Sequence, residues 1–304
     1  MPDTTPIWIG NQTSHAAATA VEPFAYALAN GFDAFEWFPD KKPSGAGWEE
    51  CDLTLEQRQA IREAARAHGI RLSVHARPEA NPLEPGLRPL LLKDVELVRE
   101  LGAALLNIHM QAAAGLKAYV ESIAWLAQYL AGIQLQLAIE NTPLDPPEQF
   151  NELFARLRDL AWARPGCVGM CFDLGHANLC PATRNNYLLY VRRLQPHVPI
   201  IHLHLHENWG DADSHLPLFT GPAGQNRAGV CEFVRELKRR GFSGSMILEQ
   251  WPQPPSLLNR AREALRQLWN EPVIPENPGA ESCRSPNQRL TAATWPGAPA
   301  TSEL

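Results

Sequence analysis

The stretch PIIHLHLH at residues 199–206 decides the fold, since it is a short apolar run that ends in histidines. Runs of the same kind recur along the chain, and most of them carry a histidine or a carboxylate as the last or next-to-last residue. They are IWIGNQ (7–12), FDAFEWF (32–38), IRLSVHA (70–76), ALLNIHM (104–110), QLQLAIE (134–140), CVGMCFD (167–173) and GSMILE (244–249). Short apolar runs bounded by turn residues are typical of enclosed β-strands.

Longer amphipathic segments separate these runs and predict helices. TLEQ at residues 54–57 has the spacing of a capping box, and Gly31 and Gly102 stand where two helices should stop. The predicted helices cover residues 15–30, 54–68, 86–102, 115–131, 146–162, a region up to 194, 226–240 and 255–269. Because strands that alternate with helices pair in parallel, eight such units favour an α/β fold of the closed (β/α)8 TIM-barrel type over an open sheet.

The barrel is expected to form a single domain over residues 1–270. The last segment, residues 271–304, is rich in Pro, Ser, Ala and Gly and shows no apolar periodicity. Such a composition buries too little apolar surface to fold, so we expect a flexible tail there.

Composition limits the partners and the compartment. The net charge is −6, with 27 Lys and Arg against 33 Asp and Glu, which argues against broad attraction to nucleic acid or to anionic membranes. No apolar run approaches the roughly 20 residues that span a bilayer. The first residues, MPDTTPIWIGNQ, lack the pattern of a secretory signal, so a cytoplasmic protein with reduced cysteines is expected.

Side chains that can bind metal stand at or just beyond the ends of the predicted strands. In a (β/α)8 barrel the carboxyl ends of all strands meet at one face, where active sites lie. A carboxylate such as Glu140 would be costly to bury there unless it were paired or coordinated. The pattern therefore predicts a metal site that carries the chemistry, formed by nine residues: His75, His109, Glu140, Asp173, His176, His204, Asp213, His215 and Glu249.

Three histidines alternate with leucines in PIIHLHLH, so His202, His204 and His206 project from one side of the strand. Residues two apart along a strand are separated by about 6.6 Å, which is too far for all three to occupy one barrel layer. His204 is therefore the preferred ligand, with His202 deeper in the barrel and His206 at the rim.

Two shorter spacings support four of the nine residues. Asp173 and His176 share a face if a helix begins after Asp173, and Asp213 and His215 form a D-x-H pair in a loop. A metal-free binding protein is disfavoured, because the clustered carboxylates would lack counter-charge. The remaining histidines are interpreted as structural, namely His15, His68 and His197.

From GFDAFEW (31–37) to ILE (247–249), the chain resembles the xylose-isomerase-like TIM barrels of AP endonuclease family 2. These include sugar phosphate isomerases/epimerases and the endonuclease IV family. The resemblance implies one metal ion held by Glu140, Asp173, His204 and Glu249. The endonuclease IV pattern implies a trinuclear zinc site with five further ligands: His75, His109, His176, Asp213 and His215.

The chain departs from both patterns. Sugar epimerases of this type usually carry an Arg shortly after the strand-seven histidine, whereas HENWGDAD follows here at residues 206–213. Endonuclease IV proteins insert Arg and aromatic side chains into DNA, but the corresponding loops, residues 39–48 and 77–86, are acidic or Pro-rich and offer only a few candidates such as Arg77 and Trp48.

Two enzymatic hypotheses follow. The preferred one is hydrolysis of a phosphoester in a small phosphorylated substrate by one to three zinc ions, with Glu140 and Glu249 at the reacting centre; an AP endonuclease acting on DNA is less favoured. The alternative is a sugar phosphate isomerase, epimerase or dehydratase that uses one divalent ion, Mn or Mg, and a polyol substrate. In that case Glu140 and Glu249 act as an acid/base pair.

Overall fold

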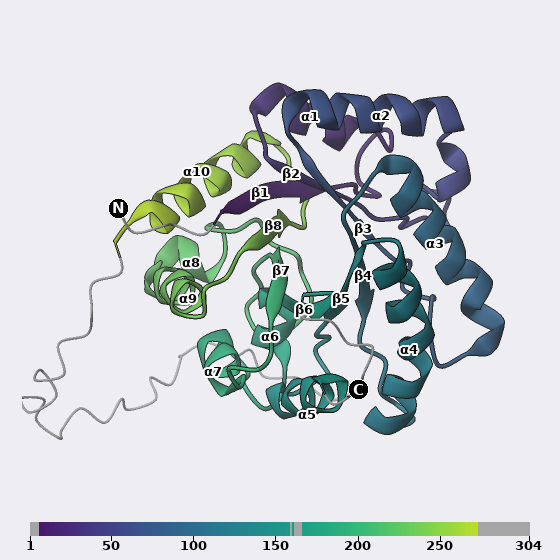
Figure 1. Cartoon of the computed structure of the whole chain (residues 1–304). Helices are drawn as coiled ribbons and strands as arrows, with labels where there is room; N and C mark the ends of the chain where they lie inside the picture. Colours follow the sequence, from purple (N-terminus) through teal and green to yellow (C-terminus); the bar gives the residue numbers. More distant parts are fainter. Residues whose placement is uncertain (1–5, 159, 161–165, 273–304) are drawn as a thin grey trace, which may run out of the picture. The chain divides into compact units, whose positions relative to one another are not determined.

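The predicted apolar runs form the strands of a closed barrel. The computed structural model describes residues 6–158, 160 and 166–272. Each strand pairs in parallel with the next, and the last pairs with the first, so the α/β TIM-barrel class is confirmed (Figure 1). The strands are β1 (Ile7–Gln12), β2 (Ala34–Trp37), β3 (Arg71–His75), β4 (Leu105–His109), β5 (Gln136–Glu140), β6 (Val168–Asp173), β7 (Ile200–Leu205) and β8 (Gly244–Leu248).

Helices surround the barrel, as Figure 1 shows. Thr54 accepts a hydrogen bond from the backbone of Gln57, so the predicted capping box is present. Gly31 and Gly102 end helices with φ of 66° and 67°. The helices are α1 (Glu22–Asn30), α2 (Leu55–His68), α3 (Arg88–Leu101), α4 (Leu116–Gly132), α5 (Pro147–Arg158), α6 (Leu174–Leu179), α7 (Tyr187–Arg193), α8 (Pro222–Gln225), α9 (Ala228–Arg239) and α10 (Ser256–Asn270), with 3₁₀ turns at Glu50–Asp52 and Pro85–Leu87.

Two predicted helical regions differ in extent from the structure, and proline explains both differences. The helix predicted from residue 15 begins at Glu22, because Pro23 lacks an N–H and fits only the first turn. The helix predicted for roughly residues 86–102 is α3, with Pro89 in its first turn. The helical region after β6 divides into α6 and α7, since Pro181 cannot continue a helix past Cys180.

The barrel forms one compact unit that extends to Glu271. The predicted tail, residues 271–304, lies outside the described residues from 273 onward, as do residues 159 and 161–165 near the end of the helix predicted for 146–162. None of the helices within the described ranges has the length and apolarity needed to cross a membrane. The cysteines in those ranges are all free thiols.

The barrel interior changes character from its middle to its mouth. Leu105, Ala138 and Cys171 form a small buried cluster on β4, β5 and β6. Side chains two residues further along a strand face the same side, so Glu140 and Asp173 also point into the barrel, one layer nearer the carboxyl ends. The fold thus places buried acidic groups directly above a small apolar layer.

Candidate metal centre

All nine predicted residues meet at the carboxyl-terminal mouth of the barrel. Their proximity agrees with expectation, while their role as metal ligands stays a prediction. His75, His109, Glu140 and Asp173 end β3 to β6, His204 lies on β7, His176 lies on α6, Asp213 and His215 lie in the loop after β7, and Glu249 follows β8.

Glu140 lies at the centre of the site. Its Oε1 is 3.5 Å from Nε2 of His109 and 3.3 Å from Nδ1 of His176. Its Oε2 is 3.1 Å from Nε2 of His75 and 3.1 Å from Nδ1 of His204, and it also accepts a hydrogen bond from the amide of Asn107. One buried carboxylate therefore contacts side chains from three strands and one helix, a position from which it could bridge two ions.

His204 joins Glu140 to the remaining strand-end carboxylates. Its Nδ1 lies 3.0 Å from Oε1 of Glu249 and 3.9 Å from Oδ2 of Asp173. Glu140, Asp173 and Glu249 thus each place a carboxylate oxygen within 3.9 Å of Nδ1 of His204. These are the four residues that the family resemblance assigns to one ion, and His204 and Asp173 are fully buried.

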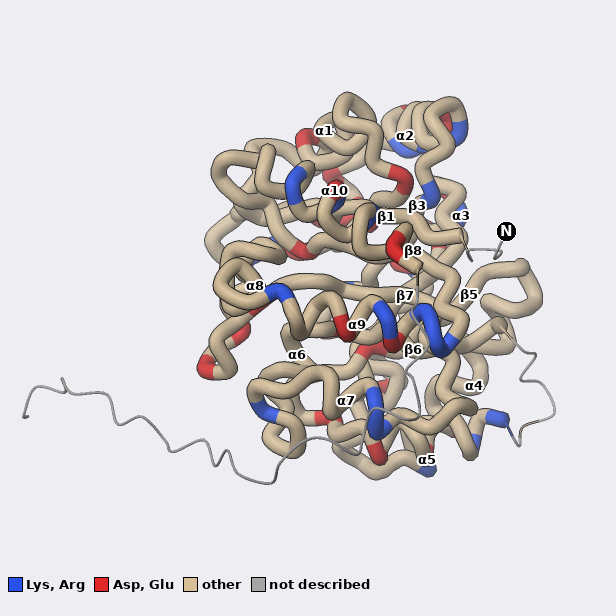
Figure 2. Tube along the Cα trace, turned by 90° about the vertical axis from the view of Figure 1, so that its left-hand side faces the viewer, with Lys and Arg blue, Asp and Glu red and all other residues tan. Residues whose placement is uncertain are grey.

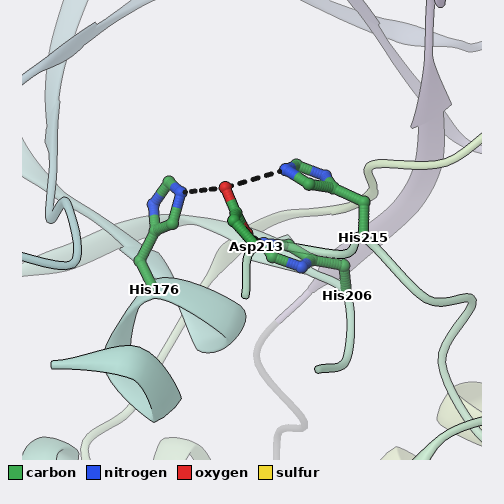
Figure 3. Close-up of side chains that lie close together, drawn as sticks. All are labelled: His176, His206, Asp213 and His215. Carbon is green, nitrogen blue, oxygen red and sulfur yellow. Dashed lines mark hydrogen bonds and ion pairs between the residues drawn. The ribbon is translucent and has the colours of Figure 1, made fainter. Parts of the chain in front are cut away.

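A second group of side chains lies next to these four residues and consists of His176, His206, Asp213 and His215 (Figure 3). Oδ2 of Asp213 is 3.2 Å from Nε2 of His176 and 3.2 Å from Nε2 of His215. The rings of His206 and His215 stack with centroids 3.9 Å apart. His206 was expected at the rim but is fully buried, with Nε2 3.2 Å from Oδ2 of Asp173. Potential ligand atoms of His176, His206, Asp213 and His215 all lie within 4.8 Å of one another.

A glycine makes room for His206. A Cβ at Gly175, on the first turn of α6, would lie 2.0 Å from the His206 ring. The Gly in the D-L-G-H sequence of residues 173–176 therefore lets the helix that carries His176 approach β7 closely.

The sequence did not reveal Glu36, a fully buried carboxylate on β2. Its Oε1 accepts a hydrogen bond from Nε2 of His204 at 2.7 Å, and its Oε2 accepts one from Nε2 of His202 at 2.8 Å. In the sequence, Glu36 stands between two aromatic residues of a short strand, FEW. A carboxylate in such a position is usually explained as facing solvent on one side of the sheet, so the sequence offered little reason to expect it in the site.

The carboxylates and imidazoles of the site hold one another in their charged forms. Burial by itself would raise the pKa of Glu140, but His204 and His109 outweigh it and hold that pKa well below its usual range. Burial lowers the pKa of His176, yet Asp173 and its neighbours raise that pKa well above the ordinary value. The neighbouring carboxylates likewise raise the pKa of His204 well above its ordinary value, so protons on His176 and His204 balance buried carboxylate charge when no metal is bound.

The chemistry of these side chains fits a divalent cation. Nδ1 of His204 and Oε2 of Glu249 are buried and lack a hydrogen-bond partner, although oppositely charged atoms surround both. Imidazole nitrogens and carboxylate oxygens directed at a common point are ligands that zinc and manganese accept. A bound cation would satisfy these atoms and replace the protons.

A cavity of about 400 Å³ opens next to the metal-binding residues. Its lining includes Glu249, Asp213 and His215 from the site, and side chains from the loops after β1, β2 and β8. His15 and Lys42 contribute basic groups, so His15 has a place at the site that its sequence context did not suggest. His68 and His197 each bond a backbone carbonyl and agree with their structural interpretation.

The DNA-contact candidates of the sequence are engaged elsewhere. Trp48 is buried against Trp37, with ring centroids 5.5 Å apart. Arg77 pairs with Glu50 at 2.6 Å and with Asp94 at 3.1 Å. On the face shown in Figure 2, α9 carries both acidic and basic residues, and Arg192 of α7 pairs with Glu232 of α9 at 2.9 Å.

The chain matches the family described as xylose isomerase-like TIM barrel over residues 24–268. A curated relative, the uncharacterised protein MJ1311 of Methanocaldococcus jannaschii, is 35% identical over 83 residues, which are 27% of this chain. The match spans only 25% of that relative's length.

Solved structures with the same fold include sugar epimerases. A D-tagatose 3-epimerase-like protein has a TM-score of 0.65 at 21% identity, with 86% of this chain and 96% of that chain covered. D-psicose 3-epimerase, solved in the presence of D-fructose, has a TM-score of 0.60 at 14% identity over 86% and 96% of the chains. A xylose isomerase domain-containing protein of Salmonella typhimurium has a TM-score of 0.64 at 17% identity over 85% and 97%.

Proposed function

The chain belongs to the xylose isomerase-like TIM-barrel family of enzymes, and we propose that it isomerises or epimerises a small polyol sugar in the cytoplasm, with one divalent metal ion at the Glu140 site. The supporting observation is that oxygens of Glu140 and Glu249 lie 3.1 and 3.0 Å from the same atom, Nδ1 of His204. Two carboxylates that meet at one metal-binding atom can remove a proton from a carbon beside a carbonyl and return it.

The cavity favours a substrate with many hydroxyl groups. Gln12, Asp40 and Gln250 are among its lining residues, and their side chains carry amide and carboxylate oxygens. Sugar hydroxyls donate hydrogen bonds to such oxygens, whereas a phosphate is itself an acceptor. The basic groups among the described lining residues are His15, Lys42 and His215, and none of these residues is an arginine, the side chain that binds phosphate oxygens in pairs.

Glu140 and Glu249 differ in how many of their oxygens are already bound by neighbouring side chains. Both oxygens of Glu140 contact histidines, while Glu249 lines the cavity and keeps Oε2 without a hydrogen-bond partner. Glu249 is therefore the better placed group to remove the proton, with Glu140 as the second member of the acid/base pair. The metal ion, when bound, supplies polarisation of the substrate carbonyl.

The direct test is a panel of ketoses and aldoses incubated with protein loaded with Mn²⁺, Mg²⁺ or Zn²⁺, with product analysis and uptake of deuterium from solvent at carbon. Glu249→Gln should lower kcat about 10²- to 10⁴-fold while the substrate still binds. Hydrolysis of small phosphoesters without any isomerisation or deuterium uptake would refute the proposal.

A multi-zinc phosphoester hydrolase is the second candidate, because ligand atoms beyond those for one ion also come together. His75, His109 and Glu140 form one group, and His176, His206, Asp213 and His215 form another. Both groups are compatible with additional ions. Elemental analysis of protein purified without chelator separates the candidates: two or three zinc ions per chain favour the hydrolase, and one ion favours the isomerase.

A further inference from the structure

Glu36 reaches the metal centre from below without belonging to it. It lies on β2, is fully buried, and uses both oxygens. Oε1 accepts from Nε2 of His204 at 2.7 Å, while Oε2 accepts from Nε2 of His202 and from the hydroxyl of Ser73, both at 2.8 Å. Because a carboxylate with three such donors only accepts hydrogen bonds, Nε2 of His204 must carry a hydrogen.

This hydrogen bond determines which atom of His204 remains available. Once a cation replaces the proton on Nδ1, the neutral imidazole keeps its hydrogen on Nε2 and presents a lone pair on Nδ1. Nδ1 lies 3.1 Å from Glu140 and 3.0 Å from Glu249, and it lacks a hydrogen-bond partner. The unpartnered nitrogen therefore faces the carboxylates that would complete a metal site.

We propose that Glu36 is a positioning residue, which fixes the ring orientation and tautomer of His204 so that Nδ1 binds the metal ion. The inference rests on the metal centre of the proposed function but not on the reaction catalysed there. A carboxylate behind a metal-bound imidazole also makes the ligand more basic, and loss of such a partner typically costs 10- to 100-fold in metal affinity.

A purely structural role for Glu36 makes a different prediction. If Glu36 only neutralised the charge of the buried imidazoles, the loss of any of its hydrogen bonds would lower the stability of the fold and the metal affinity to a similar extent. Ser73 provides the matched control, because Ser73→Ala removes a hydrogen bond to Oε2 and leaves the contact between Oε1 and His204 intact.

The first experiment measures metal affinity at His204 itself. Zn²⁺ is titrated into full-length protein with ¹⁵N-labelled histidine, and the His204 ring signals are followed in the wild type, Glu36→Gln, Glu36→Ala and Ser73→Ala. We expect affinity to fall 10- to 100-fold in both Glu36 variants and less than threefold in Ser73→Ala. Equal effects of Glu36→Gln and Ser73→Ala, or unchanged affinity in a folded Glu36→Gln protein, would overturn the proposal.

The second experiment needs no variant and so does not depend on the folding of one. In the zinc-loaded wild type, the ¹⁵N signals should show His204 with its hydrogen on Nε2 and the metal on Nδ1. Metal on Nε2 would contradict the role of Glu36. A wild type that binds no divalent metal at all would instead refute the proposed function, so the two failures are distinguishable.

Discussion

At the residue scale, His109 separates the two candidate reactions. Its Nε2 lies 3.5 Å from Oε1 of Glu140, and its ring is the most exposed of those around that carboxylate, at 23%. It is not among Glu140, Asp173, His204 and Glu249, which would hold the single ion of an isomerase. It is needed only if a further ion lies between His75 and Glu140.

The first prediction follows from this position. His109→Ala should reduce sugar isomerisation by about tenfold or less, because the ligand set for one ion stays complete. It should remove one zinc ion and reduce phosphoester hydrolysis far more strongly if the enzyme is a hydrolase. Both kcat/KM and metal content are measured, with His68→Ala on the exposed face of α2 as the control. Complete loss of isomerisation with metal content unchanged would contradict the single-ion scheme.

The position of a side chain at a strand end was predictable from the sequence, but its partners were not. Alternation along PIIHLHLH was enough to place three histidines on one face, and the strand ends located Glu140 and Asp173. Glu36 is contacted by His202 and His204, far away along the chain, so no local pattern could reveal the contact. The loop residue His215 has a φ of 43°, a conformation that apolar periodicity does not predict.

At the element scale, β1 and β2 approach each other closely at a glycine. Gly10 pairs with Ala34, and a Cβ on Gly10 would lie 2.2 Å from the backbone oxygen of Ala34. Both strands are buried at this point, so the barrel could relieve the clash only by moving a strand.

Gly10→Ala should therefore destabilise the protein by about 1–3 kcal/mol, as overpacking does in other cores. The matched control is Gly132→Ala at the end of α4, where an added Cβ meets nothing within 4 Å. That change should be neutral or stabilising by up to about 1 kcal/mol, since alanine loses less entropy in a helix. Urea unfolding measures both, and equal midpoints for the two variants would be evidence against the close approach.

Helix starts show where sequence reasoning about elements is weakest. The Ala-rich sequence from residue 15 has suitable helix propensity, but α1 begins only at Glu22. Pro23 is accepted only in the first turn of a helix, so its position determines where this helix starts. Strand order was more secure, because each strand-helix unit allows essentially one parallel, right-handed connection to the next strand.

Arg77, in the loop after β3, contacts Asp94 of α3, and the contribution of Asp94 to the stability of the fold should depend on pH. Arg77 lies 3.1 Å from Asp94, which is fully buried on α3. Burial raises the pKa of Asp94 to about 6, against the opposing effect of Arg77. Because this folded-state pKa exceeds the unfolded value of about 3.9, the associated stabilisation is complete below pH 4 and is lost as the pH rises through 6.

Asp94→Asn cannot titrate, so its stability relative to the wild type should improve as the pH rises from 4 to 7. The shift in pKa corresponds to a change of up to about 3 kcal/mol over this range. Urea unfolding of both proteins at several pH values gives the difference directly. A difference that stays constant from pH 4 to 7 would show that Asp94 does not titrate in this way.

At the scale of the whole molecule, the barrel mouth concentrates negative charge in an already acidic chain of net charge −6. Glu36, Glu140 and Asp173 are all buried there within the reach of a few imidazoles. Glu140, Asp173 and His204 lie on β5, β6 and β7 and Glu249 follows β8, so a cation held by these four residues would link four strands of the barrel. Metal binding and global stability should therefore be coupled.

Removal of metal with a chelator should lower the Tm by roughly 5–10 °C, which corresponds to about 2.7 kcal/mol for an ion present at 100 times its Kd. Stepwise return of Zn²⁺ or Mn²⁺ should restore the Tm, and calorimetry at each step counts the ions that contribute. One step of recovery at one equivalent agrees with the isomerase, whereas gains that continue to two or three equivalents agree with the hydrolase. In Glu140→Gln the recovery should be largely lost under both schemes, because this carboxylate contacts the histidines of both groups. A Tm that is indifferent to chelator and to added metal in the wild type would count against any metal centre at the barrel mouth.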